Sequence, residues 1–264
     1  MKLFIHPEGG IAGDMFAAAL INAGADAEKV TGAMKKAAEK LGRASVTHAR
    51  TAEGCSRLHI EVEHHHGHLS SIKAAHLLEE LFDDMEIREY YRGFGRKMLT
   101  HLIKAEKEAH ATYDFEMGHH HHHTGGHHHH HGHHHEEPEA WLHEAQDILI
   151  DVMGAVTGLQ ELSAPVEATL LTPVSYGGGS VSFSHGTLKV PAPATEVMIK
   201  NNQIPVKQGP VETELFTPTG AALLSALSAK NILEKPTNQP IKSGCSRGTK
   251  DLPVEPLKIF LFQE

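Results

Sequence analysis

The sequence opens with the stretch Lys2-Leu3-Phe4-Ile5-His6-Pro7-Glu8-Gly9-Gly10-Ile11-Ala12-Gly13-Asp14, from which the fold class can be approached. Its apolar beginning predicts a strand over residues 2–6. The Ala- and Leu-rich run that follows predicts a helix over residues 15–23. The first two elements therefore already combine β and α structure, joined by a glycine-rich turn.

The glycine-rich turn supports two interpretations. A turn between a strand and a helix can leave backbone N–H groups free to hold a phosphate or a carboxylate, which makes Gly9, Gly10, Gly13 and Asp14 candidate phosphate ligands. It can equally be a plain tight turn, because its spacing is neither Walker A nor GxGxxG. Asp14 can cap the helix or bind a metal. A second loop before a helix adds three phosphate candidates: Thr217, Thr219 and Gly220.

The remaining pattern predicts an α+β fold, a mixed β-sheet flanked by helices. Residues 45–63 alternate as two strands that break near Gly54, and Leu58, Ile60 and Val62 share one face. The best-defined helix spans 139–162, with a buried stripe at Leu142, Ala145, Leu149, Val152, Val156 and Leu159. Further helices are expected over 27–41, 70–83, 96–111, 195–200 and 221–229, and further strands over 166–174, 181–183 and 257–262.

Composition limits the classes of function. The chain has 264 residues and a formal net charge of −9, which argues against a nucleic-acid partner. No apolar run approaches the roughly 20 residues that a membrane helix needs, so no membrane partner is expected. Cys55 and Cys245 form no CxxC pair and no disulfide framework, which favours a reducing, cytoplasmic setting. We expect a single domain over residues 1–264.

Histidine is the outstanding residue type of the chain, with 25 copies. Most lie in the tract from His119 to His135, which we expect to form a mobile insertion over 114–138. A neutral imidazole offers nitrogen to Ni, Cu, Zn or Co, so the tract is typical of a transition-metal binder. An internal purification tag and a loop with incidental metal binding are the alternatives. The tract cannot select the metal, because nitrogen sites prefer copper to nickel.

Two other places offer ordered metal ligands. The cluster of His64, His65, His66 and His68 directly follows a predicted strand. On the helix over 139–162, the residues His143, Asp147 and Asp151 are spaced i, i+4 and i+8, and Glu144 lies close to Asp147. One histidine and several carboxylates on one helix face suit a divalent metal. The same row can also be an ordinary solvated face of the helix.

Several motifs resemble a known family, the nickel-insertion proteins of nickel-pincer nucleotide cofactor biosynthesis. The turn Gly9-Gly10-Ile11-Ala12-Gly13-Asp14-Met15 is similar to the family's Ser-Gly-Ile-Ser-Gly-Asp-Met. The runs 64–72, 143–151, 185–195, 217–222 and 248–253 match further family motifs, and the resemblance covers nearly the whole chain. His6 stands where the family has an acidic residue, and the spacing from His143-Glu144 to Asp147 is two residues shorter.

The resemblance implies insertion of nickel into pyridinium-3,5-bisthiocarboxylic acid mononucleotide, a metal-chelatase activity of the lyase class. It also implies that the family's C-terminal domain, which handles the nucleotide CTP, is absent here and is supplied by a separate chain. A non-enzymatic nickel or zinc buffer, or a metallochaperone, is the alternative. The expected phosphate ligands are Gly9, Gly10, Gly13, Asp14, Thr217, Thr219 and Gly220. The expected metal ligands are His64, His65, His66, His68, His143, Glu144 and Asp147.

Overall fold

The computed structural model describes residues 1–64, 69–112, 141–142, 147–183 and 186–263, and the fold is α+β as expected. The predicted His-rich insertion over 114–138 lies outside these residues. The helices are α1 (Gly13–Asn22), α2 (Ala27–Glu39), α3 (Ser71–Asp84), α4 (Glu89–Thr112), α5 (Ile148–Leu162), α6 (Pro193–Asn202) and α7 (Pro218–Ala226). The strands are β1 (Lys2–His6), β2 (Gly42–Arg50), β3 (Ser56–His64), β4 (Leu69–Ser70), β5 (Trp141–Leu142), β6 (Ala168–Leu170), β7 (Val174–Ser175), β8 (Ser180–Phe183), β9 (Gly186–Lys189), β10 (Val206–Lys207), β11 (Lys242–Ser246) and β12 (Leu257–Phe262).

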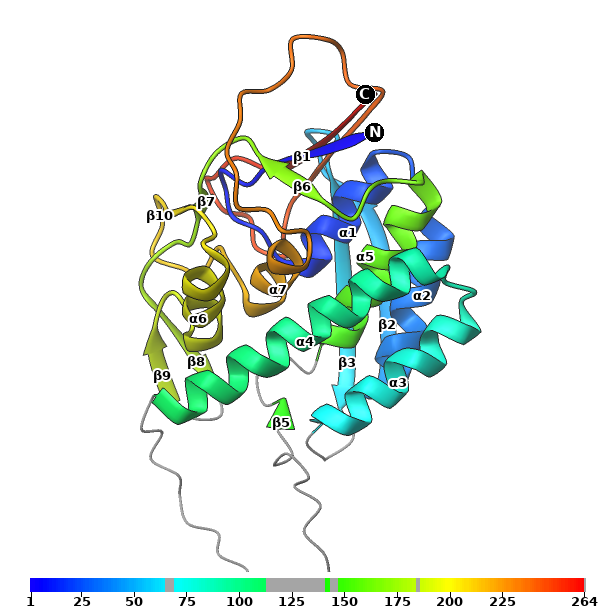
Figure 1. Cartoon of the computed structure of the whole chain (residues 1–264), viewed down its shortest axis with the longest axis vertical. Coiled ribbons are helices and arrows are strands. Elements are labelled where there is room, and N and C mark those ends of the chain that lie inside the picture. Colours follow the sequence, from blue (N-terminus) through cyan, green and yellow to red (C-terminus); the bar gives the residue numbers. More distant parts are fainter. Residues whose placement is uncertain (65–68, 113–140, 143–146, 184–185, 264) are drawn as a thin grey trace, which may run out of the picture.

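A mixed sheet of six strands, in the order β2-β3-β11-β12-β1-β6, forms one layer of the molecule. Strand β1 lies inside it, parallel to β6 and antiparallel to β12, with Lys2 opposite Phe262. The alternating side chains Leu3 and Ile5 are almost fully buried, as are Ile259 and Leu261 on the neighbouring strand. The first and last segments of the sequence therefore lie side by side (Figure 1).

The helices pack in layers on this sheet, with α5 at the centre of the helical part (Figure 1). Helices α1 and α2 contact the sheet on one side and α5 on the other, and α4 covers α5. Every residue from Ile148 to Leu159 is buried. The predicted one-sided stripe is therefore wrong, because α5 is enclosed by other helices on all sides.

Several element boundaries differ from the expectations. Helix α5 begins at Ile148 rather than at 139, because Trp141–Leu142 pairs with β4 as a short strand. The predicted strand over 166–174 is two strands in different sheets, since β6 joins β1 and β7 joins β10. Helix α4 begins at Glu89, seven residues before the predicted start at Arg96. Strand β11 was not anticipated, because its sequence Lys-Ser-Gly-Cys-Ser has little apolar character.

The two cysteines are joined in the structure. Cys55 and Cys245 form a disulfide across 190 residues, so the expectation of unpaired cysteines is wrong. The pairing follows from topology: β3 and β11 are neighbours in the sheet, and each cysteine lies beside the single bridge between Ser56 and Ser246. Within the described ranges, no helix combines the length and apolar character needed to cross a membrane.

Candidate functional site

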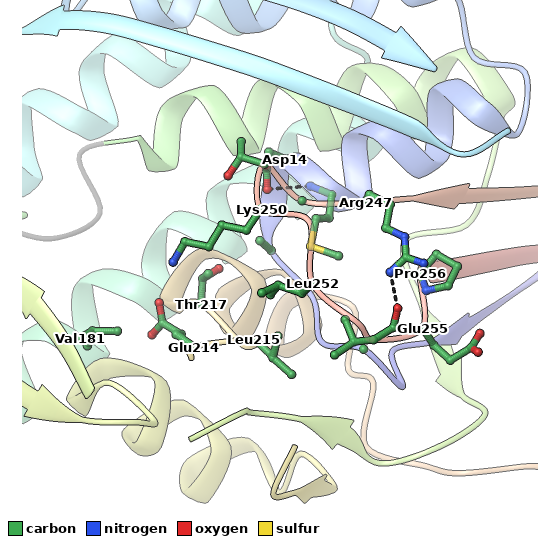
Figure 2. Close-up of a pocket in the computed structure, with 16 residues that line it drawn as sticks. Asp14, Val181, Glu214, Leu215, Thr217, Arg247, Lys250, Leu252, Glu255 and Pro256 are labelled. Carbon is green, nitrogen blue, oxygen red and sulfur yellow. Dashed lines mark hydrogen bonds between the residues drawn. The ribbon is translucent and has the colours of Figure 1, made fainter. Parts of the chain in front are cut away.

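Two adjoining cavities lie where the first turn of the chain, the start of α7 and the segment before β12 come together. The loop cavity, shown in Figure 2, has a volume of about 240 Å³ and is bounded on one side by residues 247–256. The carboxylate cavity has a volume of about 420 Å³ and contains Asp147 and Asp151. Ala12, Asp14, Glu214 and Thr217 line both cavities. Together the two reach the size of a small-molecule site, roughly 300–1,000 Å³.

Three aspartates from two helix starts line the carboxylate cavity. Asp14 belongs to the first turn of α1, Asp147 is the N-cap residue of α5, and Asp151 follows one turn later. Asp151 is 3% exposed and packs directly on Gly13, where a Cβ atom would lie 2.3 Å from its Oδ2. Only glycine leaves room for this carboxylate at the beginning of α1. The first residues of α1 and α5 therefore pack closely against each other, with the Asp151 carboxylate buried between them.

Burial raises the pKa values of all three acids, and repulsion from neighbouring carboxylates raises those of Asp147 and Asp151 further. Loss of water raises the pKa of Asp14. Loss of water in the packed surroundings, together with the charge of Asp14, raises the pKa of Asp147 to about 6, although its side chain keeps contact with solvent. Burial raises the pKa of Asp151 well above its ordinary value, and the charges of Asp147 and Asp14 raise it further. A divalent cation entering this cavity would relieve the repulsion among the carboxylates.

A pair of threonines connects the carboxylate cavity to the loop cavity. The Thr219 hydroxyl accepts the Gly13 N–H at 3.3 Å and bonds to the Asp151 carboxylate, which partly offsets the rise in the Asp151 pKa. The Thr217 and Thr219 hydroxyl oxygens are 3.2 Å apart. Thr217 also caps α7 by accepting the Gly220 N–H at 3.2 Å. The hydroxyls thus form a polar path from the open side of α7 to the buried acid.

The loop cavity has a cation and an acid that lack close partners. Lys250 is exposed and makes no ion pair with any described residue. Arg247, by contrast, is held by Glu53 and by the Val254 carbonyl. Glu214 has a buried Oε1 without a hydrogen-bond partner; burial raises the pKa of Glu214 to about 7, and the charge of Lys250 opposes this rise. In Figure 2 the Lys250 ammonium, the Glu214 carboxylate and the Thr217 hydroxyl lie on the same side of the cavity.

The structure places all seven predicted phosphate residues at or beside these cavities. Three of the turn's N–H groups already have acceptors within the protein: Gly10 donates to Pro7, Ile11 to Leu215 and Gly13 to Thr219. Gly10 has a φ of +93°, and a Cβ there would lie 2.1 Å from the Leu215 carbonyl oxygen. Close backbone contacts are therefore enough to explain why glycine stands at these positions, even without a ligand. Phosphate binding by this set remains a prediction.

Of the predicted metal ligands, Asp147 alone has a described side chain. His65, His66, His68, His143 and Glu144 lie outside the described residues, and only the backbone of His64 is described. Asp151, the next member of the predicted row, is buried against Gly13 and not part of a solvated face. Among residues with described placement, no three His, Cys, Asp or Glu side chains form a ready metal-binding group. The carboxylate cavity is thus a lined space rather than a preformed ligand set.

Asp151 was named in the candidate metal row but not among the expected metal ligands, and neither Glu214 nor Lys250 was selected as a site residue. Asp151 had a signal, because its i+4 spacing from Asp147 placed both acids on one face. No sequence pattern pointed to Glu214 or Lys250, since each is a single charged residue in a segment without regular structure. The backbone of Glu214 is paired with Gly177, a contact between distant segments that periodicity does not reveal.

Comparison with known proteins gives one consistent result. The sequence model of a family described as "Nickel insertion protein" matches residues 3–264. A pyridinium-3,5-bisthiocarboxylic acid mononucleotide nickel insertion protein of Thermotoga sp. (strain RQ2) is 31% identical over 265 residues, covering 96% of this chain and 58% of the relative. A protein of the same name from Alkaliphilus metalliredigens (strain QYMF) is 27% identical over 274 residues, with the same coverage. The chain thus spans little more than half the length of these curated relatives, and no solved structure matches it.

Proposed function

The chain belongs to the nickel insertion protein family, and from this premise we propose that it captures pyridinium-3,5-bisthiocarboxylic acid mononucleotide for the insertion of nickel. The two relatives named above carry this activity in their names. The proposed reaction is that of a nickel chelatase in the lyase class, with nickel as the cargo. The disulfide between Cys55 and Cys245 removes the basis on which a reducing, cytoplasmic setting was expected.

The observation that carries the proposal is the contrast between the two cavities. A mononucleotide with two thiocarboxylates has a phosphate at one end and metal-binding groups at the other. The loop cavity offers an unpaired cation at Lys250, and the carboxylate cavity offers three acids at Asp14, Asp147 and Asp151. Because the cavities share a wall, one ligand can reach both.

Nickel would reach the precursor from the carboxylate cavity. A hydrated nickel ion must lose water before sulfur can bind it, and carboxylate oxygens can replace that water one at a time. The predicted ligands His64, His65, His66, His68, His143 and Glu144 would complete the coordination. The tract from His119 to His135 would raise the local nickel concentration, in the way that a tethered ligand raises effective concentration.

The proposal assigns capture and nickel supply to this chain and completion of the insertion to a further domain. The sequence has no Walker-type nucleotide motif. CTP is therefore proposed to act through a domain like the family's C-terminal one, on a longer form of this chain or on a partner chain. The relatives, of which this chain spans 58%, are long enough to contain such a domain.

Calorimetry on the purified chain tests the capture step. One molecule of precursor is expected to bind per chain, and nickel binding is expected to tighten once the precursor is present. Asp147→Ala should weaken nickel binding by about tenfold or more, whereas Asp84→Ala, an exposed acid at the end of α3, should not. His143→Ala tests the predicted histidine ligand in the same assay.

An insertion assay with nickel and CTP tests the division of labour. Activity is expected only when the C-terminal region of a relative is added. Turnover by the isolated chain would contradict the division of labour. Absence of precursor binding would favour the alternative function, a nickel or zinc buffer, for which the abundance of histidine is the supporting observation.

A further inference from the structure

We propose that Glu214 and Lys250 form a ribose-phosphate clamp, in which Glu214 accepts a ribose hydroxyl and Lys250 binds the phosphate of the mononucleotide. This inference rests on the proposed function, because it concerns how the same cavities hold the precursor. It fixes the orientation of the ligand: sugar and phosphate in the loop cavity, and the pyridinium ring with its sulfur groups toward the carboxylate cavity.

The first observation is an unmet hydrogen-bond acceptor. Glu214 Oε1 is shielded from solvent and receives no hydrogen bond from the described residues. Buried carboxylate oxygens nearly always have a donor, and leaving one without a partner costs roughly 1–3 kcal/mol. Glu214 lines both cavities, and rotation of its carboxyl group would present Oε1 to a ligand there, which could supply the missing donor.

The backbone holds Glu214 in this position. The Leu215 N–H donates to the Tyr176 carbonyl at 3.1 Å, and the Leu215 carbonyl accepts the Ile11 N–H at 2.8 Å. Glu214 itself forms an isolated antiparallel bridge with Gly177. The backbone from which the Glu214 side chain projects is therefore fixed at the shared wall of the two cavities, as expected of a residue that is positioned for a ligand.

The second observation is the cation across the same cavity. Lys250 is exposed, its ammonium points into the loop cavity, and it forms no ion pair within the described part of the chain. The other cation of the cavity wall, Arg247, is committed to Glu53 and Val254. Lysine binds phosphate as a flexible point charge, which suits a mobile side chain on an open loop.

These two groups together select the class of ligand. A neutral sugar would leave Lys250 unused, and an anion without a hydroxyl group, such as sulfate, would leave Glu214 without a donor. A metal ion at Glu214 would face the charge of Lys250, which is close enough to influence that acid. A sugar phosphate supplies a hydroxyl donor and an anion in one molecule, and carboxylates that accept ribose hydroxyls are established in nucleotide sites.

The orientation follows from the shared wall. Thr217 and Asp14 line both cavities, so the ligand passes between them from one cavity to the other. With the phosphate at Lys250, the glycosidic end of the ribose is directed toward Asp14. The ring then enters the cavity that holds Asp147 and Asp151, where nickel is proposed to arrive.

Binding measurements with three ligands test the clamp without any need for turnover. The probes are pyridinium-3,5-dicarboxylic acid mononucleotide, which is the stable oxygen analogue, its nucleoside without phosphate, and the 2′,3′-dideoxy mononucleotide. Lys250→Gln should weaken binding of the mononucleotide about tenfold and leave the nucleoside unchanged. Glu214→Met should weaken the ribose forms about tenfold and leave the dideoxy form unchanged, while Glu214→Gln keeps an acceptor and should lose less.

Matched controls carry the same changes outside the clamp. Lys230→Gln alters a lysine of a different surface, and Glu212→Met alters an acid beside Gly178 that lines neither cavity. Melting temperatures identify any variant that fails to fold.

Equal losses for all three ligands in both clamp variants, or no loss in either, would overturn the clamp while leaving the proposed function intact. Failure of the unaltered chain to bind the mononucleotide, or the precursor itself, would overturn the proposed function.

Discussion

Asp151 at the carboxylate cavity and Lys250 at the loop cavity lie at opposite extremes of burial. Asp151 is 3% exposed and packed against the first residue of α1, whereas Lys250 is exposed on a segment between β11 and β12. The acid has a fixed place, and the cation has room to adapt. The difference indicates that the shape of the carboxylate cavity is set by folding, whereas the loop cavity keeps a side chain that can adjust to a ligand.

The largest expected effect comes from filling the space beside Asp151. In Gly13→Ala the new Cβ would meet the Asp151 carboxylate, so the free energy of unfolding should fall by about 3 kcal/mol. Gly248→Ala is the matched change at the loop cavity, where the nearest atom, Met15 Sδ, lies 3.5 Å away. That variant should change stability by less than about 0.5 kcal/mol. Urea unfolding followed by circular dichroism measures both, and equal losses would contradict the comparison.

A smaller effect is expected when the hydroxyl between the helix starts is removed. Thr219→Val leaves the Gly13 N–H and the Asp151 carboxylate without their shared partner, at a cost of about 2 kcal/mol. Thr249→Val, at an exposed position of the loop cavity, should have almost no effect. If Thr219→Val were as stable as the unaltered chain, the hydroxyl path would have no structural role.

The carboxylate cavity also makes stability depend on pH. The pKa of Asp151 is raised in the folded chain and that of Asp147 is raised to about 6, so the folded state holds more protons than the unfolded state. This stabilisation is complete below the unfolded pKa of about 4 and is lost as pH rises through the folded values. For metal-free protein, the loss of stability from pH 5 to pH 8 should be about 1–2 kcal/mol smaller in Asp151→Asn than in the unaltered chain.

Thermal melting at a series of pH values, analysed as free energies of unfolding, measures that difference. Thr249→Val serves as the control from the loop cavity, because it changes no charge, and should follow the unaltered chain. Parallel curves for Asp151→Asn and the unaltered chain would mean that Asp151 is ionised in both states and that its burial has no influence on proton uptake.

The smallest effect on stability is expected from the histidine tract. Deletion of residues 118–135, which lie outside the described part of the chain, should lower the number of nickel ions bound and leave the melting temperature within about 1 °C. Equilibrium dialysis with nickel and a thermal scan of the apo protein test the two halves of this prediction. A large drop in melting temperature would mean that the tract is needed for folding.

The sequence was sufficient where local pattern and local structure coincide. Strand β1 and strand β12 have the predicted bounds, and α3, which spans Ser71–Asp84, differs from the predicted range 70–83 by one residue at each end. It was insufficient for α5, whose beginning depends on a pairing between β4 and β5 that brings distant segments together. Local periodicity contains no information about such partners.

The residues of the candidate site fall into the same two groups: those that a local pattern reveals and those that depend on contacts between distant segments. Asp14 could be selected because it stands next to a recognisable helix start, and Asp147 because it belongs to a row with i, i+4 spacing. Glu214 and Lys250 line one cavity, which exists only after the segments around Leu215 and Gly248 have met the first turn. The disulfide between Cys55 and Cys245 escaped prediction for the same reason, since it depends on β3 and β11 becoming neighbours.

The pairing of residues 2–6 with residues 258–262 has a consequence for synthesis on the ribosome. Strand β1 emerges first, but its antiparallel partner is translated more than 250 residues later. At about 5–20 residues per second, this means a wait of roughly ten seconds to one minute. During that time one edge of an apolar strand stays unpaired, a state that favours aggregation. We expect nascent chains to need a chaperone at β1 until β12 has left the exit tunnel.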